Sequence, residues 1–278
     1  MKKWAFLMSS CDSYEDLWEP FFECMERFGG GQKDLSVYLN TEHKQFVPQK
    51  ELSFEVKTLN QRGSKNLTWS RRFIDVLNRI PEDYVFLVLD DFFACDTICW
   101  DLFEEIVEIM EKDKSIASFQ MYGTRTRNRD EENFVLSTEL TYKELHEGGW
   151  KTHFVPTIWR KEVLLKWLRP WESIWAFEGY GSDRARRWKY PEKVMVVDTM
   201  PIYDYLWIKD CSAVINSKWL NEPELFEFME KNEINVDWSK RGKMTHEEYL
   251  AVTMQDVIKK YTFGQIIVKC INRVRSLF

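Results

Sequence analysis

Apolar residues in the first 123 positions form short runs that alternate with segments of helical spacing. The runs at 4–10, 34–40, 52–59, 83–91 and 115–123 predict strands, and the segments at 15–28, 69–80 and 97–113 predict amphipathic helices. The glycines at 29–31 predict the end of the first helix. Such alternation is typical of an α/β fold with a mostly parallel sheet flanked by helices on both faces.

The second half of the chain has a weaker pattern. The polar segment 124–134 predicts a loop, and 153–168 predicts a strand followed by a helix. The segment 169–188 places one carboxylate, Glu178, among aromatic residues, and apolar positions in 255–278 recur at helical spacing. Neither an internal repeat nor a low-complexity linker marks a domain boundary.

Composition narrows the classes of protein. Aromatic residues make up 15% of the chain, with 13 Trp, and flat rings serve either as large core fillers or as walls of sites for sugars and bases. The net charge of -6 and the pI near 5.5 argue against a general nucleic-acid binder. Six cysteines without a CxxC pair, together with only four histidines, argue against a zinc site.

The first residues and the lengths of the apolar stretches indicate where in the cell the protein is located. The lysines at the start precede an apolar run of about six residues, which is too short for a signal peptide and predicts a strand. No stretch approaches the roughly 18 apolar residues of a membrane span. We therefore expect a cytoplasmic protein with reduced thiols.

The run "YVFLVLDDFF" ends in two adjacent carboxylates, Asp90 and Asp91. Open α/β sheets bind ligands at the carboxyl ends of their strands, and paired Asp oxygens suit Mg²⁺ or Mn²⁺ bridging a diphosphate. The alternative is that Asp90, Asp91 or Asp96 caps the helix that starts near residue 97, and Asp96 is the better placed for that. A P-loop, a dinucleotide-binding glycine motif and a GxSxG elbow are all missing from the sequence.

Several segments resemble a known family. The order "SSCDSYEDLW", "TWSRRFIDVLNRIPEDYVFLVLDDFF", "WAFEGYGSDRA", "INSKWL" and "VDWSKRG" is similar to bacterial glycosyltransferases of the GT-A type that act in capsule and lipopolysaccharide synthesis. The resemblance covers most of residues 4–243 and is most specific in 68–93 and around Glu178. It implies a GT-A-type, Rossmann-like sheet and the transfer of a sugar from a nucleotide sugar, most often a UDP-sugar, to a hydroxyl of a glycan or lipid-linked acceptor.

The resemblance also implies roles for the carboxylates. "VLDDFF" stands where the family has its DxD motif, but Asp90 and Asp91 are adjacent and Phe92 follows. We therefore expect Asp91 to bind Mn²⁺ or Mg²⁺, with Asp90 as a second ligand or turned toward the donor. Glu178 occupies the place of the base of an inverting reaction, and partial desolvation by its aromatic neighbours would raise its proton affinity. The alternatives are a structural Glu178 that bonds a backbone amide, and Asp183 as the base.

The donor site is predicted from strand ends and from the resemblance. The expected donor-binding residues are Ser10, Cys11, Asp12, Asn40, Trp69, Ser70, Arg71, Asp90, Lys218 and Arg241. The N-terminus of the helix that opens with Trp69 would face the nucleotide. For Arg71 and Arg72 a solvated helix face is the equal alternative, and only the resemblance lifts Lys218 and Arg241 above ordinary surface cations.

The domain prediction follows from the same segments. Residues 1–245 would form the catalytic domain, with a donor half at about 1–123 and an acceptor half at about 124–245, and 246–278 would form a C-terminal helical extension. Within 256–278, five Lys or Arg against Asp256 alone give +4 on an amphipathic helix. Such a helix either lies peripherally on an anionic membrane surface or packs on the domain.

Two rival functions remain. A sugar-phosphate nucleotidyltransferase would need a glycine-rich loop after the first strand, and "SSCDSYED" supplies no glycine. A non-catalytic carbohydrate-binding or scaffold protein of a glycan assembly complex would keep the aromatic residues but bind no nucleotide.

Overall fold

The computed structural model describes residues 3–30, 34–63, 67–121, 140–197, 202–259 and residue 274. These residues fall into two compact units, Met1–Tyr205 and Leu206–Phe278. The predicted division into a catalytic domain and a C-terminal helix region is a functional one and stays a prediction. The loop expected at 124–134 and the tail beyond Lys259, apart from Val274, lie outside the described residues.

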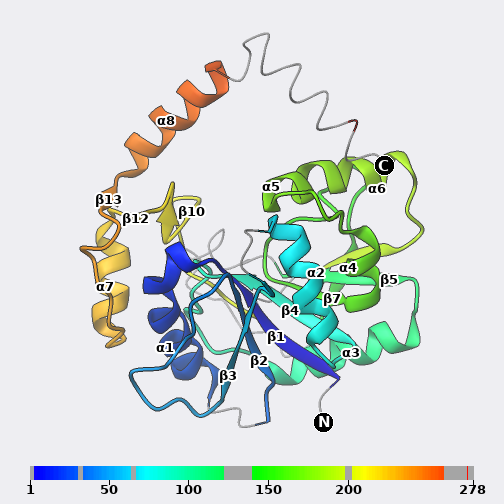
Figure 1. Cartoon of the computed structure of the whole chain (residues 1–278), viewed down its shortest axis with the longest axis horizontal. Coiled ribbons are helices and arrows are strands. Elements are labelled where there is room, and N and C mark those ends of the chain that lie inside the picture. Colours follow the sequence, from blue (N-terminus) through cyan, green and yellow to red (C-terminus); the bar gives the residue numbers. More distant parts are fainter. Residues whose placement is uncertain are drawn as a thin grey trace. The chain divides into compact units, whose positions relative to one another are not determined.

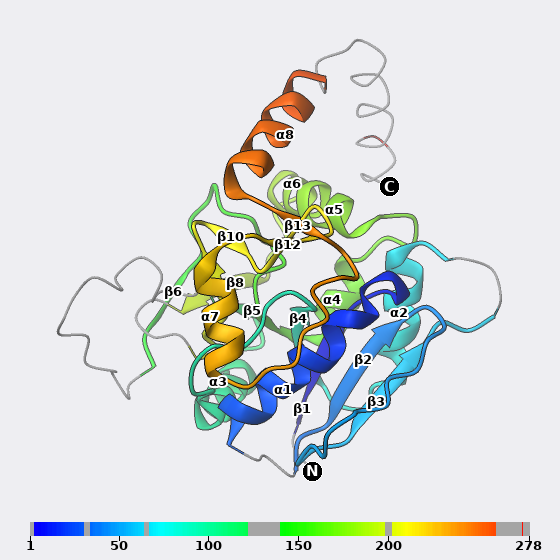
Figure 2. The same cartoon turned by 90° about the vertical axis from the view of Figure 1, so that its left-hand side faces the viewer.

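The first unit contains a sheet with the strand order β3-β2-β1-β4-β7-β5-β8-β6, in which Figure 1 labels the first six strands and Figure 2 labels β8 and β6. Its strands are β1 (Trp4–Ser9), β2 (Val37–Thr41), β3 (Val56–Asn60), β4 (Tyr84–Leu89), β5 (Ile116–Gln120), β6 (Tyr142–Glu144), β7 (Thr157–Arg160) and β8 (Lys193–Val197). β7 and β6 run antiparallel to their neighbours, and the other strands share one direction. The predicted α/β class with a mostly parallel sheet is therefore confirmed.

Four helices of this unit follow the predicted segments with shifted ends, whereas the helical run 174–187 is not predicted from the sequence. The helices of this unit are the 3-10 helix η1 (Asp12–Leu17), α1 (Trp18–Gly29), α2 (Trp69–Arg79), α3 (Trp100–Lys112), α4 (Lys161–Trp167), α5 (Ile174–Ala176), the π-helix η3 (Phe177–Gly181) and α6 (Ser182–Arg187). Gly30, with φ of 63°, ends α1 in the left-handed conformation that glycine adopts at low cost. The alternative that Asp96 caps this helix is wrong, because the residue at the N-cap of α3 is Cys99, and Asp96 accepts a hydrogen bond from the amide of Thr97 instead.

Alternating residues of β1 and β4 pack on opposite sides of the sheet, as the strand period of two requires. Ala5 and Leu7 join a cluster with residues of α2 and α4. Trp4 and Phe6 face the other way, where Trp4 stacks on Phe103 of α3 and Phe6 meets Phe21 of α1. α1 and α3 thus cover one face, and α2 and α4 cover the other (Figure 2).

The second unit contains short strands together with the helices α7 and α8. They are β9 (Trp207–Ile208), β10 (Cys211–Ser212), β11 (Val214–Ile215), β12 (Lys218–Leu220), α7 (Pro223–Lys231), β13 (Lys243–Met244) and α8 (His246–Lys259). Trp238 packs edge-on against Trp219 and Phe226, with ring centroids 5.0 and 4.7 Å away. Among the described residues, no helix is long and apolar enough to cross a membrane.

Candidate active site

The two carboxylates after β4 lie at the carboxyl ends of β1 and β4, which pair in parallel. Ser10, directly after β1, donates a hydrogen bond from Oγ to Asp90 Oδ2, and the indole of Trp18 donates to the same Ser10 Oγ at 2.7 Å. Asp90 is buried, whereas Asp91 is partly exposed. The structure therefore brings Ser10 and Asp90 together, and it leaves Asp91 the more accessible of the two acids.

Phe92 points away from the ends of β1 and β4 and into the core. Its ring is buried against Tyr205, with centroids 4.7 Å apart, and its carbonyl accepts a 2.8 Å hydrogen bond from Tyr203. The chain that follows Asp91 thus returns to the core. The departure from a DxD pattern has a packing reason, because the third position of the motif is a core position here.

The side chains available as metal ligands restrict the kind of metal site that Asp90 and Asp91 could form. Among the described residues, no group of three or more His, Cys, Asp and Glu side chains could hold an ion. Mg²⁺ commonly binds through one or two carboxylates together with substrate phosphates. Asp90 and Asp91 therefore fit an ion that arrives with a diphosphate, and they do not fit one held by protein alone.

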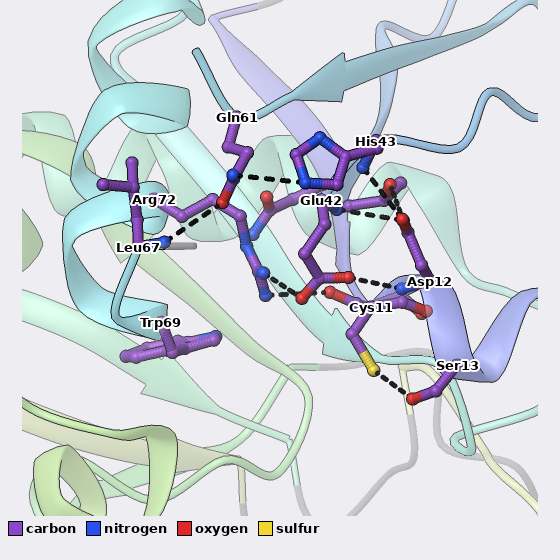
Figure 3. A network of polar contacts seen from close by, with 12 residues as sticks. Cys11, Asp12, Ser13, Glu42, His43, Gln61, Leu67, Trp69 and Arg72 are labelled. Atoms are coloured by element: carbon purple, nitrogen blue, oxygen red, sulfur yellow. Dashed lines mark hydrogen bonds and ion pairs between the residues drawn. The ribbon is translucent and has the colours of Figure 1, made fainter. Parts of the chain in front are cut away.

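Asp12 holds the backbone at the carboxyl ends of β1 and β2 (Figure 3). Its Oδ1 accepts hydrogen bonds from the amides of Glu42, His43 and Lys44 at 3.0 to 3.1 Å. The hydroxyl of Thr41 donates to the same oxygen at 2.8 Å. Burial acts to raise the pKa of Asp12, but these hydrogen bonds outweigh it and lower the pKa. Asp12 therefore fixes the turn after β2, and its predicted contact to a donor stays a prediction.

The neighbouring arginines of α2 have different surroundings. Arg72 is buried, forms an ion pair with Glu42, and donates from Nη2 to the carbonyl of Ser10 at 3.2 Å (Figure 3). Arg71 is exposed on the first turn of α2. The solvated-face alternative is thus wrong for Arg72, whose side chain joins β1, β2 and α2. Nothing in the spacing of Glu42 and Arg72 along the sequence signals this pair.

Other predicted donor residues divide by burial. Asn40 and Ser70 are fully buried, and Asn40 packs beside Ser9, toward whose Oγ its amide points at 3.4 Å. Cys11 is partly buried, which raises the pKa of its thiol and disfavours a thiolate there. Asn40 thus supports the strand ends from inside, Ser70 donates its amide to the carbonyl of Glu172 at 3.2 Å, and Cys11 retains exposed surface.

Trp69 joins this edge to the second half of the unit. Its indole donates to Ser9 Oγ at 3.2 Å, and its ring stacks on Phe73 at 4.8 Å. The same ring meets Phe154 edge-on at 5.3 Å and lies 6.1 Å from the ring of Phe177. Phe177 directly precedes Glu178. Trp69 therefore places the Glu178 segment at the same end of the sheet as Ser9 and Ser10.

Glu178 lies on η3 with a side chain 13% exposed. Its Oε1 accepts a 3.0 Å hydrogen bond from the amide of Phe154 and lies 3.5 Å from His153 Nε2. Burial raises the pKa of Glu178, against the opposing effect of the Phe154 amide. Burial lowers the pKa of His153, because it disfavours the charged imidazolium. Glu178 thus accepts a hydrogen bond from a backbone amide, as the structural alternative predicted. Its proton affinity is also raised, as a base requires.

The π-helical turn that carries Glu178 has specific support. π-helical turns inside helices occur frequently at functional sites. Thr152 donates its hydroxyl toward the carbonyls of Phe177 and Glu178, each 2.9 Å away. A Cβ at Gly181 would come within 2.9 Å of the Thr152 hydroxyl oxygen, so the approach of Thr152 requires glycine at this position.

A buried ion pair holds the segment around this turn. Arg184 donates from Nη1 to Glu172 Oε1 at 2.7 Å and from Nη2 to the carbonyl of Trp167 at 2.9 Å, and both paired side chains are 1% exposed. Asp183, the alternative base, is partly exposed and forms an ion pair with Arg186. Sequence reasoning missed His153, Thr152, Glu172 and Arg184, since their partners are distant in sequence or lie in a segment that reads as solvated.

Lys218 and Arg241 belong to the second unit. Lys218 is exposed on β12, and Arg241 donates from Nη1 to the carbonyl of Ser217 at 3.2 Å. The structure therefore brings these two predicted donor residues close together in the chain's second unit. Their contact to a diphosphate stays a prediction.

Comparisons with known proteins give a likeness of fold only. No family model matches the chain, and no curated protein matches it. Among solved structures, S. aureus TarS 1-349 in complex with UDP matches with a TM-score of 0.44 and 11% identity over 86% of this chain and 68% of that one.

Two further matches among solved structures are a synthetase and a cytidylyltransferase. A CMP:2-keto-3-deoxy-manno-octonic acid synthetase complexed with CTP has a TM-score of 0.39 and 12% identity over 72% of this chain and 94% of that one. A cytidylyltransferase from Leptospira borgpetersenii has a TM-score of 0.40 and 11% identity over 84% of this chain and 96% of that one. With identity and TM-score this low, the likeness says nothing about the activity of this chain.

Proposed function

We propose that this protein is an inverting GT-A-type glycosyltransferase that moves a sugar from a nucleotide sugar, most simply a UDP-sugar, to a glycan or lipid-linked hydroxyl. The observation that carries the proposal is the convergence of two kinds of carboxylate at one end of the sheet. Asp90 and Asp91 follow β4, and Trp69 ties the segment of Glu178 to the end of β1. The sequence resemblance supports the same assignment.

Each carboxylate has a role in a single displacement. The acceptor oxygen attacks the anomeric carbon, its proton passes to Glu178, and the bond from that carbon to the diphosphate breaks with its electron pair leaving on the diphosphate. Because burial raises the pKa of Glu178, the carboxylate is a stronger base than an exposed Glu. Mn²⁺ or Mg²⁺, when bound, would offset the charge on the leaving diphosphate. Asp91 would hold the ion, and Ser10 would orient Asp90 beside it.

The donor pocket would use the partly exposed residues of the same edge. Arg71, on the first turn of α2, would offer a cation near the helix N-terminus, where backbone amides favour phosphate. Cys11 and Trp69 would supply the walls for the nucleotide. In surface polysaccharide synthesis, residues 256–278 would bring the enzyme to an anionic membrane.

Donor turnover tests the proposal. A panel of nucleotide sugars should release free nucleotide in the presence of Mn²⁺, and EDTA should suppress that release. Calorimetry should show that UDP binds and that Mn²⁺ strengthens its binding. Absence of any nucleotide binding would favour the non-catalytic carbohydrate-binding protein. Release of pyrophosphate from a nucleoside triphosphate and a sugar phosphate would instead identify a nucleotidyltransferase.

A further inference from the structure

Two exposed tryptophans belong to the surroundings of Glu178, one through helical spacing and one through His153. Trp175 is 71% exposed and lies three residues before Glu178 in the continuous helical run 174–187. Residues three apart on a helix are surface neighbours. Trp150 is 50% exposed, and its ring centroid lies 5.9 Å from that of His153, whose Nε2 is 3.5 Å from Glu178 Oε1.

The backbone at both tryptophans is fixed. The carbonyl of Trp150 accepts a 2.8 Å hydrogen bond from the side chain of Gln120, which is fully buried at the end of β5. The turn that carries Trp175 is capped by Ser173, whose Oγ accepts from the amide of Ala176 at 3.2 Å. The rings are thus exposed on supported backbone, which makes them suited to bind a ligand without a large cost of ordering.

We propose that Trp150 and Trp175 form the acceptor subsite and that it takes a pyranose ring. A pyranose has an apolar C–H face, which stacks on an indole, and a rim of hydroxyls, which need hydrogen-bond partners. Here His153 contacts the ring of Trp150, and Glu178 follows Trp175 by three residues on the helical run, so polar groups stand beside both rings. A wholly apolar partner would bury these polar groups without hydrogen bonds, which is unfavourable. An open-chain polyol has hydroxyls but no flat face to stack.

The inference rests on the proposed function, because it names the chemical class of the acceptor whose hydroxyl Glu178 would deprotonate. It adds a requirement that the transfer reaction itself does not impose. The acceptor must present a six-membered sugar ring at its accepting end, and stacking would turn the accepting hydroxyl toward Oε1 of Glu178.

Saturation-transfer NMR on the full chain tests the subsite directly. The probes are methyl pyranosides of hexoses and N-acetylhexosamines, with ribitol as the open-chain comparison. Wild type should bind at least one pyranoside more strongly than ribitol. Trp175→Ala and Trp150→Ala should each weaken that binding about tenfold, the upper end of a stacking contribution, whereas Trp175→Phe should retain most of it. Trp188→Ala is the matched control, because Trp188 is 58% exposed but stands at the C-cap of α6, about 15 Å along the helical run from Glu178.

Donor hydrolysis separates this inference from the proposed function. Trp188→Ala should release nucleotide from the donor at the wild-type rate, whereas transfer to the bound pyranoside should fall in Trp150→Ala and Trp175→Ala together with its binding. The subsite is refuted if no pyranoside binds to wild type, or if Trp188→Ala weakens binding as much as Trp150→Ala and Trp175→Ala do. Loss of vesicle binding in Trp175→Ala, with pyranoside binding unchanged, would also refute it in favour of a membrane contact. Selective loss of pyranoside binding in a chain without donor turnover would keep the sugar site and remove the transferase.

Discussion

Trp69 donates a 3.2 Å hydrogen bond from its indole to Ser9 Oγ and thereby ties the first turn of α2 to the end of β1. The rings of Phe154 and Phe177 pack around the same indole. Since Phe154 donates its amide to Glu178, the position of the proposed base depends on this tryptophan.

Trp69→Ala should therefore lower turnover as well as stability. The loss of the indole leaves a cavity among Phe73, Phe154 and Phe177, and truncation of a large buried aromatic commonly costs about 3–5 kcal/mol, here toward the lower end because Trp69 is only partly buried. Trp69→Phe removes the hydrogen bond but keeps most of the packing, so it should lose about 1 kcal/mol. Urea denaturation of both variants measures the difference, and equal losses would contradict a packing role for the ring.

Gly181→Ala should disturb the turn that carries Glu178. The added Cβ would meet the hydroxyl and methyl of Thr152 at 2.9 and 3.2 Å, and forced overpacking of this kind costs about 1–3 kcal/mol. Gly179→Ala is the control, because a Cβ there meets nothing within 4 Å. Thermal melts should separate the two variants. A Gly179→Ala loss as large as that of Gly181→Ala would count against the close approach of Thr152.

Arg184→Met should be strongly destabilising. It leaves Glu172 buried without its charged partner, and breaking a buried pair from one side costs about 3–5 kcal/mol. Arg186→Met removes a surface pair and should change the free energy of unfolding by at most about 1 kcal/mol. Denaturant unfolding of both variants checks the contrast, which similar midpoints for the two would refute.

Much of the fold follows from local pattern, and much of the site does not. The apolar run of β4 predicts that Asp90 and Asp91 stand at a strand end, because a strand buried on both faces must reach the sheet edge before it can expose charge. The antiparallel insertion of β7 between β4 and β5 is set by pairing between distant segments. Arg184 reads as one more cation in "SDRARRW", and only the tertiary partner Glu172 distinguishes it from Arg186 and Arg187.

The pH dependence of Glu178→Gln follows from the raised pKa of Glu178. Because the folded-state pKa lies above the unfolded value, ionisation costs stability as pH rises through the folded pKa. At pH 7, Glu178→Gln should therefore melt at or above the temperature of wild type, and this advantage should shrink as pH falls below the folded pKa. A lower melting temperature for the variant at pH 7 would mean that the ionised form is favoured by folding.

Turnover should require the ionised form of Glu178, whereas stability is higher with the protonated form. The base must be ionised, so the acid limb of the wild-type pH profile should lie above the ordinary Glu range, and Glu178→Gln should lose roughly 10²-fold or more in turnover. Donor affinity, measured by calorimetry with UDP, should be unchanged. Unchanged turnover would move the role of base to Asp183 or elsewhere.

The most direct measurement of the central claim is metal-stimulated release of nucleotide from the donor by Asp91→Ala. The control is Asp101→Ala, which removes an exposed acid from the first turn of α3. We expect Asp91→Ala to abolish the stimulation by Mn²⁺ while its thermal melt stays near that of wild type, and we expect Asp101→Ala to retain full activity. Metal-stimulated release that persists in folded Asp91→Ala at the wild-type rate would contradict the assignment of these carboxylates to the diphosphate of a sugar donor.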